Sequence, residues 1–268
     1  MTISILDEGG RPVRSLRGTK QAGINRVWWD LRYEASREPR LRTPPQGHPH
    51  VTLPPSGWRP LIEWTYPRES QIRPLAAPGR YTVRLRAGDR AMDEALIVKK
   101  DPHSAGTEAD IQRQVKLSLD VRDTVGSLTD TIDRIELIRR QLYDLIAVQE
   151  SRGQPDREVV GAARKLDAKL IDVEEHLFQT TTAGGSLDAI RNGVRLYAKL
   201  VRLGGDIGSS DFPPTRAELE VYDLLKNQLA QQQTELKRVI DTDGAAFNKL
   251  LLKQGTLLTE IARGPIAF

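Results

Sequence analysis

The sequence predicts an α+β protein of two domains, an immunoglobulin-like β-sandwich at residues 1–103 and an antiparallel bundle of three to four long α-helices at residues 104–268. Two observations predict this fold class. Short β-branched and aromatic runs, separated by glycine-rich turns, fill the first part of the chain. Farther along, apolar residues recur every three or four positions, which is the period of an amphipathic helix.

The clearest strands are expected at both ends of the first domain. The β-rich runs 2–6 and 12–16 flank a glycine turn and predict a hairpin. The run 25–31 is aromatic and β-branched, so it predicts a further strand. Apolar and polar residues alternate in the run 80–86, which predicts a half-buried strand, and a turn leads from it to a last strand at 94–98.

A proline-rich segment separates these strands. Ten of the 16 prolines lie within 39–78, and proline removes the N–H that a central strand needs. We therefore expect a long extended loop at about 34–78, with one short strand around 61–66. This loop carries Trp58 and Trp64, which either form an exposed contact surface or fold back over the sandwich.

Long helices are expected in the second domain. The first follows the capping residue Thr107 and continues without proline for about 40 residues. The second is amphipathic over 159–177, where apolar gaps of four and three alternate as in a coiled coil. A third is expected over 187–201 and is ended by the glycine pair at 204–205. The first helix is longer than its neighbours, so part of its apolar seam is expected to form a dimer or partner surface unless the last segment covers it.

The last long helix has the strongest start signal. Thr215 and Glu218 form a capping-box pattern after a pair of prolines. The apolar period then continues over 219–240, and Asp243-Gly244 predicts a break or kink before a shorter helical segment.

The sequence contains no recognisable catalytic motif, such as a P-loop, HExxH or GxSxG pattern. The absence of cysteine excludes disulfides, thiolate nucleophiles and cysteine-ligated metals. His48-Pro49-His50 is the nearest approach to a metal-binding pair, but it lies among prolines without a nearby acid. Carboxylates of the first helix, including Asp133 and Glu136, are expected on its solvated face. We therefore predict no catalytic residue, no cofactor and no metal, and hence no enzyme.

Positive charge is concentrated in the first domain. Residues 1–105 hold 18 Lys+Arg against 11 Asp+Glu, and Arg80, Arg84 and Arg86 share one face of an expected strand. Such a face attracts anionic partners such as acidic glycans, although a solvated surface is the commoner outcome. No nucleic-acid-binding motif accompanies these arginines, so nucleic acid is not a predicted partner.

Three segments of the chain carry a resemblance to a known family. They read TISILDEGGRPVRSL from Thr2, QAGINRVWWDLRYE from Gln21 and APGRYTVRLRAGDRAMDEALIVKKDP from Ala77. Their order resembles the hook-capping-type immunoglobulin-like domain near the C-terminus of exported bacterial β-propeller proteins of the sortilin-like, BNR-repeat kind, often labelled glycosyl hydrolase. The helical tail is also similar to the end of such proteins. The 268 residues contain no propeller, to which the hydrolase label belongs, so a fragment or a split gene is expected.

The resemblance implies an exported bacterial protein, periplasmic or extracellular, although the first residues lack signal-peptide features and no run is apolar enough to span a membrane. The leading hypothesis is a non-catalytic accessory module that binds a β-propeller protein or associates with itself through its helices. The predicted contact surfaces are Trp58, Trp64, the three arginines and an uncovered edge strand near 2–6. Two alternatives are a carbohydrate-binding module that uses both tryptophans and a hydrolase-associated domain.

Overall fold

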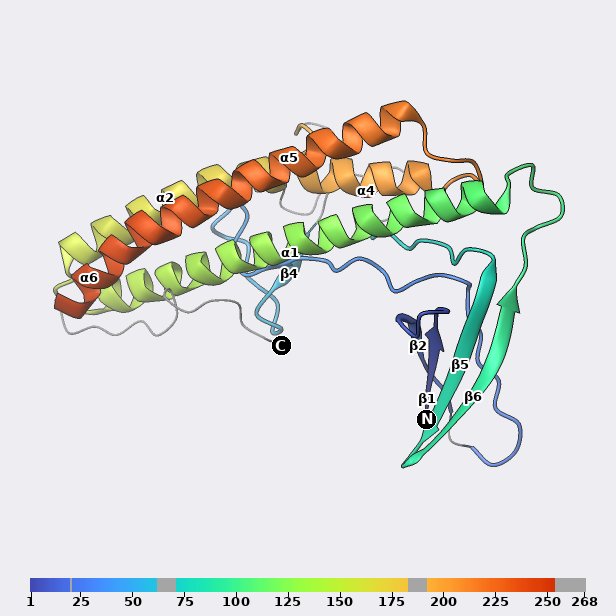
Figure 1. The fold of residues 1–268 in the computed structure, drawn as a ribbon. Helices are drawn as coiled ribbons and strands as arrows, with labels where there is room; N and C mark the ends of the chain where they lie inside the picture. The colour runs from blue at the N-terminus through green and yellow to red at the C-terminus, as the bar shows by residue number, and fades with distance from the viewer. Residues whose placement is uncertain (20, 62–70, 183–191, 254–268) are drawn as a thin grey trace. The chain divides into compact units, whose positions relative to one another are not determined.

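The computed structural model describes residues 1–19, 21–61, 71–182 and 192–253 (Figure 1). Its contacts divide the chain into two compact units. We call them the sheet unit, made of Met1–Arg37, Glu69–Val125 and Leu200–Tyr222, and the helical unit, made of Glu38–Arg68, Gly126–Lys199 and Asp223–Phe268. The longest helix contributes residues to both units, and the predicted domain boundary at 103/104 stays a prediction.

A four-stranded antiparallel sheet forms the centre of the sheet unit, with the order β2-β1-β5-β6. Its strands are β1 (Thr2–Leu6), β2 (Pro12–Arg17), β5 (Gly79–Ala87) and β6 (Arg90–Val98). The predicted hairpin of the first two strands and the predicted strand at 80–86 are confirmed. The last strand begins four residues before its predicted start, directly after the turn at Gly88 and Asp89.

One face of this sheet carries the core of the unit. Ile5, Val13 and Tyr81 are buried there, and Trp29 and Tyr33 pack against them. The predicted strand at 25–31 is wrong, because this segment is a coil that lays Trp29 on the sheet, with its ring centroid 5.7 Å from that of Tyr81. The aromatic ring of Trp29 thus reflects burial rather than strand pairing, whereas Trp28 is 79% exposed.

The structure shows a small antiparallel sheet in this unit. It does not confirm the predicted β-sandwich. The layer over the core face of the sheet comes from the coil that contains Trp29 and Tyr33. A second pair of very short strands, β3 (Arg40–Leu41) and β4 (Arg59–Pro60), belongs to the helical unit instead. The short strand predicted around 61–66 lies almost wholly outside the described residues.

Two long helices follow the sheet in sequence. Helix α1 covers Glu108–Ser151, and its start is closed by the predicted cap, since Thr107 Oγ1 accepts the N–H of Asp110 at 3.1 Å. Helix α2 covers Arg157–Leu177 and is capped by the side chain of Asp156. The predicted apolar seam of α2 is buried along its whole length, so this prediction is confirmed.

The later helices differ in part from the predictions. Of the helix predicted over 187–201, residues 187–191 lie outside the described residues and residues 192–195 are not helical. Helix α4 covers Leu196–Ile207 and passes through the glycine pair that was expected to end a helix. Gly204 is needed for close packing, because a Cβ there would come within 2.5 Å of Ile72 Cδ1. Helix α5 (Arg216–Val239) continues through a π-helical turn at Ile240–Gly244, the site of the predicted break, into α6 (Ala245–Lys253).

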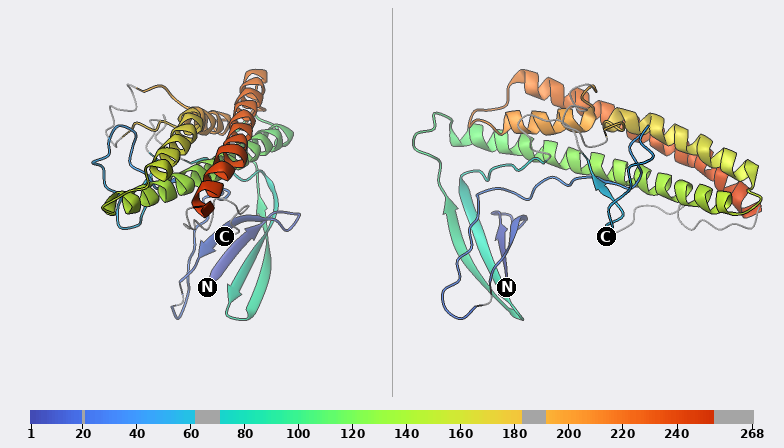
Figure 2. Two further views of the ribbon diagram at one scale, coloured as in Figure 1. Left: turned by 90° about the vertical axis from the view of Figure 1, so that its left-hand side faces the viewer. Right: turned by 180° about the vertical axis from the view of Figure 1, so that it is seen from behind.

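In the helical unit, the second half of α1 lies beside α2, and α6 lies beside α2 (Figure 2). The seam of α1 is buried at the predicted positions, including Leu128, Ile132, Ile135 and Leu142. The structure therefore confirms a helical bundle. None of the helices in the described ranges is long and apolar enough to cross a membrane.

Replacing Thr215 by alanine should lower the free energy of unfolding by about 1 kcal/mol. Thr215 Oγ1 accepts the N–H of Glu218 at 3.2 Å, and its own N–H donates to Glu218 Oε2 at 2.7 Å, so the predicted capping box is formed. Thr234→Ala, in the exposed middle of the same helix, is the matched control and should be neutral or slightly stabilising. Urea denaturation of both variants measures the difference, and equal effects would contradict the capping role.

Candidate functional site

The three candidate arginines lie on the face of β5 opposite the core, because Tyr81 and Val83 between them pack into the core. Arg84 is neutralised by Asp93 of β6 through two hydrogen bonds, at 2.8 Å from Nε and 2.7 Å from Nη2. These bonds hold the pKa of Asp93 below its ordinary value. The structure thus brings the arginines together as predicted, but the face is less basic than the sequence suggests.

The sequence placed an uncovered edge near residues 2–6, and this is wrong. Strand β1 pairs with β2 on one side and with β5 on the other, so it lies inside the sheet. The hairpin partner is a neighbour in sequence, whereas the pairing with β5 spans nearly 80 residues and leaves no local signal. Among the described strands, the two edges of this sheet are β2 and β6.

Strand β6 is an open edge. All six residues from Arg90 to Ala95 are exposed, although alternate residues of a strand point to opposite faces. Met92 and Ile97 are each 62% exposed. The strand has nine residues, contains no proline and pairs with β5 without a bulge. It therefore lacks the proline and the bulge that commonly close a sheet edge, and its protection is limited to the charges of Arg90, Asp93 and Glu94.

The β5–β6 hairpin determines which backbone groups of this edge are free. Ala87 and Arg90 pair across a two-residue turn, where Gly88 has φ 61°, as a type II′ turn requires. The pair that closes such a turn is hydrogen-bonded, and hydrogen-bonded pairs then alternate with non-hydrogen-bonded ones. The outward N–H and C=O groups of the edge therefore belong to odd-numbered residues. These are Ala91, Asp93, Ala95 and Ile97.

Strand β2 forms the opposite edge, and this edge is closed. The N–H of Glu34 donates to the carbonyl oxygen of Val13 at 2.9 Å, and the N–H of Ser15 donates to Glu34 Oε1 at 2.8 Å. A bulge between Ile5 and Leu6 also interrupts the pairing with β1. The two edges of one sheet thus differ in whether a further strand can add.

The proline-rich loop contributes Trp58 to the surface of the helical unit. Its side chain is half-buried, and the Arg40 guanidinium lies over its ring at 5.5 Å from the centroid. Trp64 lies outside the described residues. A carbohydrate-binding surface needs both rings to be coplanar and open to solvent, so this alternative stays a prediction.

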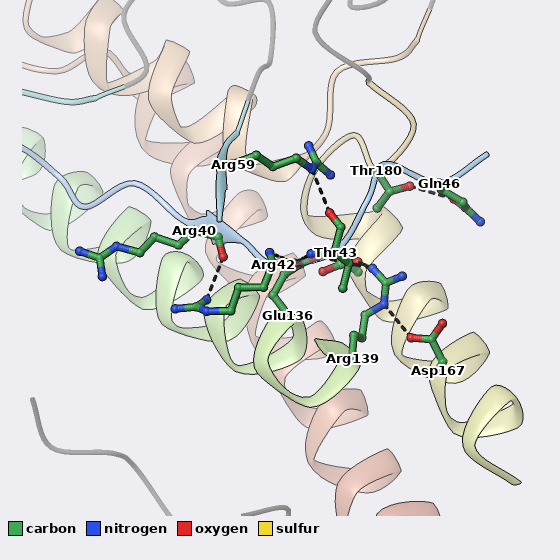
Figure 3. Close-up of polar contacts among 10 residues, drawn as sticks. Arg40, Arg42, Thr43, Gln46, Arg59, Glu136, Arg139, Asp167 and Thr180 are labelled. Atoms are coloured by element: carbon green, nitrogen blue, oxygen red, sulfur yellow. Dashed lines mark hydrogen bonds and ion pairs between the residues drawn. The ribbon is translucent and has the colours of Figure 1, made fainter. Parts of the chain in front are cut away.

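Glu136 of α1 anchors the same loop in the helical unit (Figure 3). Its carboxylate accepts the N–H of Arg42, the N–H of Thr43 at 2.7 Å and the hydroxyl of Thr43 at 2.8 Å. One helical turn earlier, Asp133 Oδ1 accepts the N–H of Arg40 at 2.8 Å. Glu136 is fully buried, so the prediction that it lies on the solvated face is wrong. It hydrogen-bonds loop backbone that would otherwise be buried without partners.

Arg139 links this anchor to α2. Its guanidinium donates to Glu136 at 3.5 Å, to Asp167 at 2.8 Å and to Glu174 at 2.5 Å, and only 3% of Arg139 is exposed. Burial lowers the pKa of Arg139, but the three carboxylates raise it by more. Arg139 therefore stays charged and neutralises acids from both helices.

Glu174 of α2 completes this cluster, and its carboxyl group has a raised pKa. Burial raises its pKa well above the ordinary value, Arg139 lowers it, and Glu136 raises it again. Its Oε1 atom is buried and has no hydrogen-bond partner within the described residues. Glu136 and Glu174 are both 0% exposed, so neither carboxyl group reaches a substrate. The cluster positions the loop and the two helices rather than forming a catalytic acid pair.

Because of Glu174, the free energy of unfolding should fall as the pH rises above about 4.3, the ordinary pKa of glutamate. Below this value the carboxyl group is protonated in both states. Above it only the unfolded chain releases the proton, so stability falls by up to about 1.4 kcal/mol per pH unit until the pH passes the pKa in the folded protein. Glu174→Gln should remove this contribution, whereas Glu175→Gln should keep it. Urea denaturation between about pH 4 and pH 8 measures both, and equal slopes for Glu174→Gln and the wild type would contradict this assignment.

Sequence reasoning missed the buried cluster, although a signal was present. Arg139 follows Ile135 by four residues and precedes Leu142 by three, so it occupies an apolar position of the seam. Glu174 likewise follows Leu170 by four residues on α2. Opposite charges at two such positions indicate a buried ion pair between helices.

The two histidines of the loop, His48 and His50, lie close together. The rings of His48 and His50 lie 5.7 Å apart in an edge-to-face arrangement. Within the described ranges, no three histidine or acidic side chains gather closely enough to hold a metal ion.

Comparisons of the chain with protein-family models, with curated proteins and with solved structures give no match.

Proposed function

We propose that this protein is a non-catalytic interaction module that binds a partner chain by strand addition at β6. The observation that carries this proposal is the difference between the two sheet edges. Glu34 and a bulge close β2, whereas the outward N–H groups of β6 have no partner in the part of the chain that the structure describes. An open edge of this kind accepts a further strand, and the exposed Met92 and Ile97 add side-chain contacts.

The sheet unit is proposed to be a reduced immunoglobulin-like sandwich. The order of the three motif segments supports this reading, since the first forms the β1–β2 hairpin and the last forms β5 and β6. The middle segment supplies Trp29 and Tyr33, which cover the core face where a second sheet would lie. The same resemblance supports an exported β-propeller protein as the larger protein or the partner, with Trp58 as a further contact residue.

Ala95→Pro tests strand addition. The N–H of Ala95 points away from β5, so proline should leave the β5–β6 pairing in place while it removes an outward donor and obstructs the edge. The immobilised full-length chain is incubated with an extract of its source organism, and retained proteins are quantified. We expect a β-propeller protein or another specific partner to bind the wild type and to be retained at least tenfold less by Ala95→Pro.

Ala95→Gly is the matched control, because it also weakens the strand but keeps the N–H. It should retain the partner. Circular dichroism and thermal unfolding establish that both variants are folded. The proposed function is overturned if folded Ala95→Pro and Ala91→Pro variants, each of which lacks one outward N–H of the edge, both retain the same proteins in the same amounts as the wild type.

A further inference from the structure

An apolar row crosses the sheet and ends at the open edge. Leu16, Ile3, Leu85 and Met92 lie opposite one another in register, one on each strand from β2 to β6. The row lies on the core face, because Ile3 packs against the core. The first three side chains are half-buried, whereas Met92 is 62% exposed. The row thus ends in a large apolar side chain that has no neighbour on its outer side.

We propose that the strand added to β6 is the β6 strand of a second copy of this chain, paired antiparallel with the two Met92 residues opposite each other across a twofold axis. This inference rests on the proposed function and names the partner for it. The apolar row would then continue from Met92 of one copy through Met92 and Leu85 of the other. Aliphatic cross-strand contacts of this kind stabilise sheets.

Charge complementarity selects this register. Centred on Met92, the pairing places Arg90 of each copy opposite Glu94 of the other, so two opposite-charge pairs form. A register centred on Asp93 opposes two identical carboxylates. A register centred on Glu94 overlaps more residues, but it also places two carboxylates directly opposite each other. A register centred on Ala95 forms no opposite-charge pair within β6, because Asp93 lies opposite Ile97, Glu94 lies opposite Leu96, and Arg90 lies beyond the overlap.

The backbone of the edge fits the same register. The N–H and C=O of Met92 point toward β5, so the two copies of Met92 form a non-hydrogen-bonded pair at the axis. On either side, the outward groups of Ala91 meet those of Asp93 of the other copy and form hydrogen-bonded pairs. Each copy uses the same strand, and Glu34 closes the opposite edge of its sheet, so association stops at a dimer.

Single cysteines test the register directly, because the chain contains no cysteine of its own. In a non-hydrogen-bonded antiparallel pair the Cα atoms lie about 4.5 Å apart, which a disulfide can span. Under mild oxidation, Met92→Cys should form a covalent dimer, while Asp93→Cys and Glu94→Cys should react at least tenfold more slowly. Met92 is exposed, so this change should leave the melting temperature nearly unchanged. No cross-link from Met92→Cys, or faster cross-linking from Glu94→Cys, would overturn the proposal.

A charge exchange supplies an independent test. Arg90→Glu and Glu94→Arg should each weaken the dimer at least tenfold in sedimentation equilibrium, and the double variant should restore most of the affinity. A double variant no tighter than either single variant would contradict the register. If the wild type is monomeric and Met92→Cys forms no cross-link, while Ala95→Pro still abolishes retention of another protein, this inference fails and the proposed function stands.

Discussion

Replacing Arg139 by alanine should lower the free energy of unfolding by about 3–5 kcal/mol. The guanidinium donates to carboxylates on both α1 and α2, and 97% of Arg139 is removed from solvent, as its 3% exposure shows. Without the Arg139 guanidinium, Glu136 and Asp167 stay in a site shielded from solvent and lose the cation of α1 that neutralised them. The cost arises from the charges that remain rather than from the loss of one contact.

Arg140→Ala is the matched control on the same helix. Arg140 pairs with Asp144 at 3.0 Å, but their side chains are 47% and 58% exposed, so the expected change is about 0–1 kcal/mol. Urea denaturation of both variants gives the comparison. The burial argument is wrong if the two substitutions cost the same.

Replacing Glu136 by alanine should cost about 3 kcal/mol and release the loop that it anchors. The change leaves the part-buried N–H of Arg42 and the buried N–H of Thr43 without their acceptor, and it also removes a partner of Arg139. Amide hydrogen exchange at Arg42 and Thr43 should accelerate by roughly 100-fold, because these bonds no longer resist local opening.

Glu150→Ala serves as the control for Glu136→Ala. It removes another carboxylate of α1, but the Glu150 side chain is half-exposed and pairs with Arg164 at the surface. It should leave exchange in the loop unchanged. Unchanged exchange at Thr43 in Glu136→Ala would contradict the anchoring role. Because Glu136 and Arg139 share a hydrogen bond, the costs of Glu136→Ala and Arg139→Ala should not add in the double variant.

Local patterns were sufficient to predict most of the helices and the hairpin. The seam of α2 and the capping box of Thr215 and Glu218 each lie within a few turns of one helix, where period and hydrogen-bonding capacity determine the outcome. The alternation along β5 also placed Arg80, Arg84 and Arg86 on one face correctly.

The features that escaped prediction depend on residues far apart in sequence. Gly204 was expected to end a helix, but it permits close packing against Ile72. The segment around Trp29 has the composition of a strand, yet its aromatic ring covers the sheet. Glu136 had the appearance of a surface acid because its partner Thr43 lies more than 90 residues away. Pairings of this kind leave no periodic signal in a single sequence.

The same limit applies to the candidate binding edge. The sequence indicated an open sheet edge, and we expected it at β1. The pairing of β1 with β5 joins segments far apart in the chain, so no local pattern predicted it. The open edge is β6, which lies at the end of the sheet order opposite β2, and Glu34 closes the edge of β2.

Amide hydrogen exchange along β6 in dilute, uncomplexed protein tests the central claim most directly. The open edge predicts an alternating pattern, in which Ala91, Asp93 and Ala95 exchange almost as fast as unstructured amides while Met92 and Glu94, bonded to β5, are protected. Equal protection of both sets in the monomer would show that the outer side of β6 is already occupied, and the proposed binding edge would not exist.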